Sequence, residues 1–209
     1  MAAKKKARKA TTSKKAAKKL KKASPARAAA VKKKSAAKKS PAKAPPKAPA
    51  QPAPAKGPKI GDRAPDFTLP TDGTGSVTLS ALRGKPVVLY FYPRDDTPGC
   101  TMEACGFNDN LPNFSSVNAE IVGISKDNEA SHARFRDKYG LKFRLAADTE
   151  TKVAKAYGVW VEKSLYGRKY MGMDRATYLI DKDGVIRNVW RSVKVAGHVD
   201  DVLKAVQAL

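Results

Sequence analysis

From residue 58 onward, apolar and polar positions alternate in a way that predicts strands and helices in turn. Residues 86–92 form an unbroken apolar run that stops at Pro93, as expected for a central strand buried on both faces. Shorter strands are predicted at residues 66–69, 76–79, 119–125, 143–146, 175–180 and 185–190. A helical turn is predicted at residues 80–84, and helices from about residue 101 and at residues 129–139, 150–157 and 200–209.

The order of these elements predicts the fold class. Parallel strand–helix units come first, and a hairpin follows because residues 181–184 (DKDG) form a turn signal between the last two strands. A final amphipathic helix closes the chain. This order makes an α/β sandwich with a mixed central sheet, and it fits a thioredoxin-like fold.

The first 57 residues show no such pattern. They form a Lys/Ala repeat that becomes rich in Pro and Ala from Ser40. Of the 42 Lys and Arg residues in the chain, 21 fall in residues 1–60, which hold no Asp or Glu, so the formal charge of +23 belongs almost wholly to this segment. Because the first aromatic residue is Phe67, we predict a disordered basic arm and linker at residues 1–57 and one folded domain at residues 58–209.

The charge of the arm favours binding to nucleic acid. A lysine that neutralises a phosphate releases condensed counterions, which gives affinity without sequence preference. The strings SPAR and SPAK at residues 24–27 and 40–43 resemble the S-P-x-K/R units of linker-histone tails. We therefore predict DNA binding through residues 1–43, with these candidates: Lys4, Lys5, Lys6, Lys14, Lys15, Lys18, Lys19, Lys32, Lys33 and Lys34. A solubilising tail, a membrane-surface contact and a processed targeting peptide are the alternatives.

Hydropathy limits where the protein is expected to act. No apolar run approaches the roughly 18 residues of a transmembrane helix, and the N-terminus lacks the apolar core of a secretory signal. We expect a protein that is not secreted and does not bind membranes. The expected location is the cytoplasm, with association to the nucleoid or to chromatin if the arm binds DNA.

The two cysteines, Cys100 and Cys105, are the candidate chemical groups. A secreted disulfide scaffold would hold more cysteines, spread more widely, so a close pair suggests redox chemistry, metal binding or accident. The only histidines, His132 and His198, are distant in sequence, which disfavours a metal site.

Cys100 stands where a reactive thiol is expected. It follows a buried strand and the loop at residues 93–99, and it opens a predicted helix, whose free N–H groups and dipole favour the thiolate. The alternative is a buried, inert cysteine. The Pro/Gly loop before Cys100 and the second cysteine after it favour the reactive interpretation, with Thr97 and an arginine as hydrogen-bond donors.

Helix geometry limits what Cys105 can do. Residues five positions apart on an α-helix have Cα atoms about 8.6 Å apart, whereas a disulfide tolerates at most about 7 Å. If both cysteines lie on one intact helix, they cannot form a disulfide unless the helix unwinds. Gly106 and Pro112 weaken that helix.

These residues resemble a known family. Pro93, Thr97 and Cys100 match the P-x-x-x-T-x-x-C signature of peroxiredoxins, and the wider string FYPRDDTPGCTMEAC resembles the PrxQ (bacterioferritin comigratory protein) subfamily. The string GVWVEKSLYGRKYMGMDRATYLIDKDG is similar to the same subfamily and places Arg175 where peroxiredoxins carry their active-site arginine. The resemblance covers about residues 58–209 and says nothing about the arm.

The resemblance implies a thiol-dependent peroxidase for hydrogen peroxide and organic hydroperoxides, with no metal, haem or flavin cofactor. By position, Cys100 is the peroxidatic cysteine, and Thr97 and Arg175 stabilise the thiolate and the transition state. Pro93 shapes the loop and shields Cys100. Cys105 resembles the resolving cysteine, which would form an intramolecular disulfide that a thioredoxin-type dithiol reduces. A monomer is expected because both cysteines belong to one chain.

Two other functions are weighed against a peroxidase. The first is a nucleic-acid-binding, histone-like protein with a secondary redox domain. The second is a general disulfide oxidoreductase, which is the weaker alternative because such enzymes usually carry C-x-x-C.

Other polar and aromatic residues are expected to be structural. We expect a solvated side chain for His132, a local structural role for His198, packing roles for Trp160 and Trp190, and loop-shaping carboxylates at Asp95 and Asp96.

Overall fold

The computed structural model describes residues 57–73, 75–165 and 167–209. The predictions for residues 1–56, including every candidate DNA-binding lysine, lie outside the described residues. Among the described residues, no helix is both long and apolar enough to cross a bilayer.

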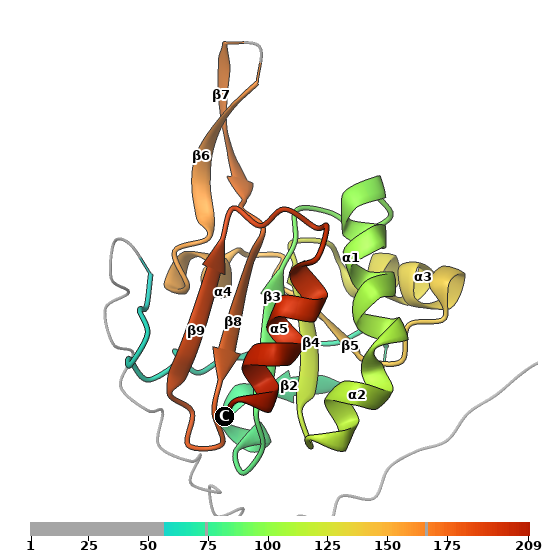
Figure 1. Cartoon of the computed structure of the whole chain (residues 1–209). Coiled ribbons are helices and arrows are strands. Elements are labelled where there is room, and N and C mark those ends of the chain that lie inside the picture. Colours follow the sequence, from blue (N-terminus) through green and yellow to red (C-terminus); the bar gives the residue numbers. More distant parts are fainter. Residues whose placement is uncertain (1–56, 74, 166) are drawn as a thin grey trace, which may run out of the picture. The chain divides into compact units, whose positions relative to one another are not determined.

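A five-stranded mixed sheet forms the centre of the domain, with strand order β5-β4-β3-β8-β9 (Figure 1). Strands β3 (Val87–Phe91), β4 (Glu120–Ser125) and β5 (Arg144–Ala147) are parallel, and β8 (Ala176–Ile180) and β9 (Ile186–Arg191) run antiparallel to β3 and to each other. The predicted mixed sheet and thioredoxin-like class are confirmed.

Strand β3 is buried on both faces, as its apolar sequence predicts. All five of its residues are at most 2% exposed. Val87, Leu89 and Phe91 pack into one core layer, and Val88 and Tyr90 pack into the other. A strand with no solvent face belongs in the middle of a sheet, and β3 is the central strand of the five.

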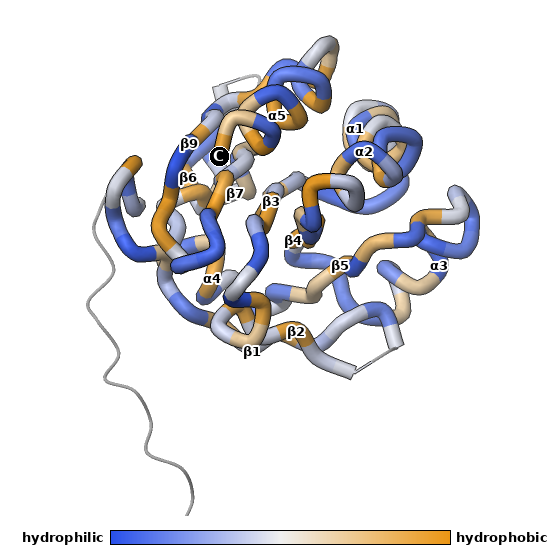
Figure 2. The backbone as a smooth tube through the Cα atoms, turned by 60° about the horizontal axis from the view of Figure 1, so that its bottom comes forward, coloured by the Kyte–Doolittle hydropathy of each residue, from blue (hydrophilic) through white to orange (hydrophobic). Residues whose placement is uncertain are grey.

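Helices cover both faces of the sheet. The layer around Tyr90 is formed with α1 (Pro98–Asp109), α2 (Leu111–Ser116), α3 (Glu129–Tyr139) and α5 (His198–Gln207). Along α5, apolar and polar stretches alternate, and its buried residues recur every three or four positions (Figure 2), as in an amphipathic helix.

The opposite layer is formed by shorter elements. They are β1 (Thr68–Pro70), β2 (Ser76–Thr78), the 3-10 helix η1 (Leu79–Leu82) and α4 (Lys152–Ala156). Strands β1 and β2 pair with each other alone, as a separate antiparallel sheet.

Three features differ from the sequence expectation. Pro112, which was expected to weaken the helix that carries both cysteines, lies in the separate helix α2, because α1 ends at Asp109. Helix α1 begins at Pro98 rather than near residue 101, because proline suits the first helical turn, where an N–H has no partner. A hairpin of β6 (Trp160–Leu165) and β7 (Arg168–Met173) projects from the sheet (Figure 1) and was not predicted. Most of its described residues are at least partly exposed, so the sequence lacks the apolar alternation of a half-buried strand.

Gly123 on β4 tests how tightly the sheet packs. It pairs with Tyr90 on β3, and a Cβ at Gly123 would lie 2.7 Å from the Tyr90 ring. We expect Gly123→Ala to lower the free energy of unfolding by about 1–3 kcal/mol, since buried neighbours have no room to move. Urea denaturation measures this.

Gly172→Ala is the matched control for Gly123→Ala. It also adds a methyl group to a strand, but the neighbouring ring belongs to Tyr170, which is 48% exposed and can move aside. An equal loss of stability in the two variants would contradict the packing argument.

Candidate active site

The register between β3 and β8 brings Arg175 close to Cys100. Phe91 pairs with Ala176, so Arg175 comes opposite Tyr92, at the point where the chain leaves β3. From there the loop at residues 93–97 leads directly into α1. Two segments that are distant in sequence thus meet at one end of the sheet.

Cys100 lies in the first turn of α1 and is 2% exposed. An Nη2 hydrogen of Arg175 points at its Sγ, with a donor–acceptor distance of 3.1 Å. A Cβ at Gly99 would lie 3.3 Å from the same Nη2, so glycine leaves the guanidinium room to approach. Because arginine keeps its charge in proteins, this contact places a fixed positive group against the Cys100 sulfur.

Glu103 is the third member of the group formed with Cys100 and Arg175, and the sequence analysis missed it. It lies one helical turn after Cys100, is fully buried, and accepts a hydrogen bond from Arg175 Nη1 through Oε2. Its other oxygen, Oε1, has no hydrogen-bond partner among the described residues. Burial raises the pKa of Glu103 to about 7, and Arg175 offsets only part of that rise. The spacing of three residues from Cys100 on a helix was the signal available.

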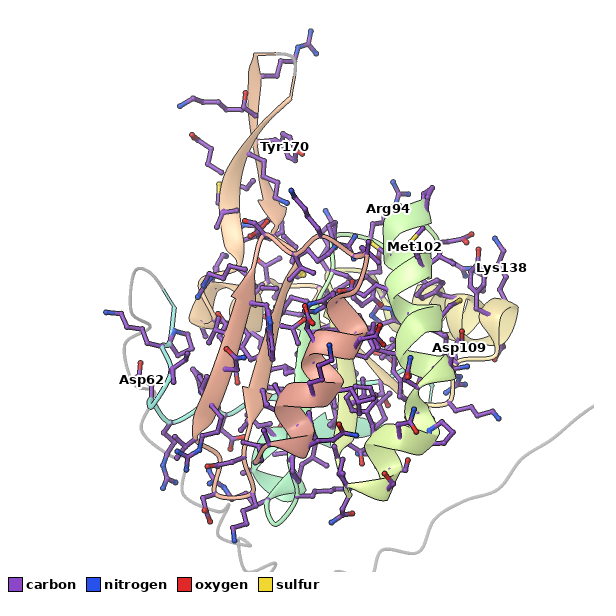
Figure 3. The ribbon with its side chains drawn as sticks, viewed as in Figure 1. Asp62, Arg94, Met102, Asp109, Lys138 and Tyr170 are labelled. Atoms are coloured by element: carbon purple, nitrogen blue, oxygen red, sulfur yellow. The ribbon has the colours of Figure 1, made fainter. Side chains whose placement is uncertain are left out.

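Thr97 and Pro93 lie in the same loop but do not bond Cys100. Thr97 is the N-cap residue of α1, and its hydroxyl donates to the carbonyl of Arg94 at 3.1 Å. Pro93 is half-buried just beyond β3. Arg94 and Met102 lie at the amino-terminal end of α1 (Figure 3).

Cys105 lies on the same intact helix as Cys100, and both cysteines are free. Because their Cα atoms are too far apart on an intact helix, a disulfide between them requires α1 to unwind. Partial burial and the nearby charge of Asp109 raise the pKa of the Cys105 thiol. The intact helix thus keeps Cys105 in its less nucleophilic form.

The expectation of a solvated His132 is wrong. Its side chain is fully buried, and Nδ1 lies 2.9 Å from a carboxylate oxygen of Asp95. Although α3 is mostly polar, it turns His132 and Phe135 toward the core. Asp96 instead lies at the surface and pairs with Lys138.

His198 has the structural role expected of it. Its Nε2 and the hydroxyl of Thr177 share a hydrogen bond of 2.8 Å, and burial lowers the pKa of His198 to about 4. Trp190 packs edge-on against His198, and Trp160 packs against the opposite core layer.

No metal cluster competes with the cysteine site among the described residues. None of their His, Cys, Asp and Glu side chains form a group of three or more that could hold a metal ion. A cavity of about 490 Å³ lies between β1, α4 and the loop before α4, and neither cysteine lines it.

The pKa of Glu103 makes stability depend on pH. Between about pH 4.5 and pH 7 the native protein holds a proton that the unfolded chain has released, so stability falls as pH rises through this range. We expect Glu103→Gln to remove about 1–3 kcal/mol of that decline, measured by urea denaturation of the reduced protein at several pH values. The exposed Glu129→Gln should change nothing, and parallel curves for wild type and Glu103→Gln would contradict the assignment.

Comparison with known proteins shows the family of this chain. Residues 60–189 match the AhpC/TSA family. The chain is 50% identical over 145 residues to a peroxiredoxin bcp of Coxiella burnetii, covering 69% of this chain and 96% of the relative. It is 46% identical over 149 residues to peroxiredoxin Bcp of Bacillus subtilis, covering 71% and 95%.

Solved structures agree with these relatives. A bacterioferritin comigratory protein of Xanthomonas campestris has a TM-score of 0.66 at 42% identity, over 68% of this chain and 90% of its own. A PrxQ Cys→Ser variant of Xylella fastidiosa has a TM-score of 0.68 at 38% identity, over 72% and 96%. The chain belongs to the AhpC/TSA family, and with these relatives it is a peroxiredoxin of the Bcp/PrxQ type, a thiol peroxidase.

Proposed function

We propose that this peroxiredoxin reduces peroxides at Cys100, closes a Cys100–Cys105 disulfide within one chain, and is recycled by a thioredoxin-type dithiol. The observation that carries the proposal is the 3.1 Å contact between Arg175 and the Cys100 sulfur. Cys105 lies on the same helix.

In the first step, the Cys100 thiolate attacks one oxygen of the peroxide. The S–O bond forms as the O–O bond breaks, and the departing oxygen takes up a proton to leave as water or an alcohol. The guanidinium of Arg175 stabilises the negative charge as it moves from sulfur to oxygen. Thr97, one turn before Cys100, would orient the peroxide, and Pro93 would limit the access of water.

In the second step, the Cys105 sulfur attacks the Cys100 sulfenic acid. The S–S bond forms, and the hydroxyl group leaves with the thiol proton as water. Unwinding of α1 brings the two sulfurs together. It also separates Cys105 from Asp109, which removes one cause of its raised pKa. The external dithiol then reduces the bond by thiol–disulfide exchange and is itself oxidised.

The substrates proposed are hydrogen peroxide and organic hydroperoxides. The similar Xanthomonas campestris structure is described for its alkyl peroxide reduction activity. That report concerns the relative, and it supports the inclusion of organic hydroperoxides here.

Replacement of the three central residues should separate the steps. Cys100→Ser is expected to abolish peroxide consumption. Cys105→Ser should consume one equivalent and then stall with thioredoxin. Arg175→Lys should lower kcat/KM by about 10²–10³-fold. A single ammonium group cannot donate to Cys100 and Glu103 at once, as the two nitrogens of the guanidinium do.

Peroxide consumption with thioredoxin and its reductase measures turnover in these variants. Intact-mass analysis after one equivalent of peroxide shows whether the disulfide closes within one chain and whether the product is a monomer. Turnover by Cys100→Ser close to that of the wild type would refute the proposal.

A second role is proposed for the basic arm. The family match begins at residue 60, so the peroxidase domain does not account for the 21 Lys and Arg residues in residues 1–60. We infer that the arm binds DNA through its lysines and holds the enzyme at the nucleoid or at chromatin. A dense run of positive charges attracts the negatively charged phosphates of DNA.

Neutralising the arm in the full chain tests this role. Changing the ten candidate lysines to Gln should lower the affinity for DNA, measured by mobility shift, by at least tenfold at low salt. The affinity of this variant should also depend less on salt concentration. Peroxide turnover in dilute solution should stay the same. A wild-type shift that does not respond to salt would rule out the electrostatic mechanism.

A further inference from the structure

The loop that leads to Cys100 is held by buried and partly buried polar side chains. Asp95 is the centre of this group, which we name the Asp95 cluster: Asp95, Tyr92, Asp127, Ser131 and His132. The cluster lies outside the contacts of Cys100, Glu103 and Arg175.

The side chain of Asp95 accepts three kinds of hydrogen bond. The hydroxyl of Tyr92 donates to Oδ1 at 2.8 Å, and the hydroxyl of Ser131 donates to Oδ2 at 2.7 Å. Nδ1 of His132 lies 2.9 Å from Oδ2 and 3.1 Å from Oδ1. One carboxylate thus joins the end of β3 to the first turn of α3.

The backbone of Asp95 is held as well. Its N–H donates to Oδ2 of Asp127 at 2.8 Å, and the same oxygen accepts a hydrogen bond from the hydroxyl of Ser125 at the end of β4. Residue 95 is therefore joined through both its backbone and its side chain to structure that does not belong to α1.

Burial makes these contacts strong. Asp95 is 7% exposed and His132 is fully buried. Desolvation opposes the charged carboxylate, but its hydrogen bonds from His132, Ser131 and Tyr92 together outweigh it, so the pKa of Asp95 lies below its ordinary value. A buried carboxylate that lost a partner would be costly, so the cluster resists opening.

The neighbouring carboxylate provides a contrast. Asp96 is exposed, and it accepts hydrogen bonds from Lys138 at 2.7 Å and from the hydroxyl of Tyr139 at 2.6 Å (Lys138 is labelled in Figure 3). Exposed ion pairs contribute little to stability. Of the two adjacent aspartates, Asp95 is the one able to hold the loop.

We propose that Asp95 is a positioning residue for the peroxidase cycle: the Asp95 cluster holds the loop at residues 93–97 in the position that it takes when α1 is intact. This inference rests on the proposed two-step function. With the loop fixed, Thr97 and the start of α1 hold Cys100 against Arg175 for the reaction with peroxide. The same restraint favours the wound helix, so it slows closure of the disulfide.

Loosening the cluster should therefore change the two steps in opposite directions. His132→Leu removes the donor to Asp95, whereas His132→Asn keeps a donor at the position of Nδ1. In His132→Leu, we expect oxidation of Cys100 to slow by roughly tenfold and disulfide closure to quicken by a similar factor, the order of effect of one lost hydrogen bond. His132→Asn should restore both rates to within about threefold of the wild type.

Single-turnover reactions of the full chain with one equivalent of hydrogen peroxide, quenched with an alkylating reagent and read by intact mass, give both rates. Ser131→Ala repeats the test with a smaller change, the loss of one hydroxyl donor to Asp95, in case His132→Leu does not fold. Two controls complete the set. Asp96→Asn changes the exposed carboxylate, and Ile186→Ala lowers stability from the opposite core layer.

The outcomes separate the proposals. Opposite changes in His132→Leu and Ser131→Ala, absent from both controls, support the positioning role. Unchanged rates, a fall in both rates, or the same split in Ile186→Ala would overturn it. Failure of the wild type to form the Cys100–Cys105 disulfide would instead refute the proposed function, and this is read before the variants are compared.

Discussion

The antiparallel pairing of β3 with β8 is the constraint on which the proposed active site depends. Because Phe91 pairs with Ala176, Arg175 stands beside the point where the chain leaves the sheet for Cys100. Strand β3 is buried on both faces, and a slip of one residue would exchange the side chains of its two core layers. The contact between guanidinium and sulfur is thus set by the packing of the core, through a register that the loop itself does not determine.

The two buried carboxylates, Asp95 and Glu103, differ in the groups that compensate their charge. Asp95 has its hydrogen bonds from three side chains, which favour its charged form. Glu103 has Arg175 on one oxygen and no partner for the other among the described residues, and burial favours its protonated form. A full negative charge on Glu103 would oppose the thiolate. The raised pKa of Glu103 and the guanidinium of Arg175 both reduce that repulsion.

The parts of the fold that could be predicted are those that residues close together in the sequence determine. The apolar run at residues 86–92, the DKDG turn and the cysteine at a helix start each follow from neighbouring residues. His132 could not be placed in this way, because its partner Asp95 is 37 residues away and the helix around it is polar. The β6–β7 hairpin was missed for a similar reason: its exposed residues carry no apolar pattern. Glu103 was within reach, since helical spacing alone relates it to Cys100.

The placement of both cysteines within the twelve residues of α1 has a consequence for the redox potential. In the proposed cycle the disulfide can exist only while the helix is unwound, and the helix reforms once the bond is reduced. The free energy of helix formation therefore adds to the driving force for reduction, which makes the oxidised protein a stronger oxidant than an unstrained disulfide would be. A dithiol of modest reducing power is then sufficient to return the enzyme to its reduced state, because helix formation supplies the remaining free energy.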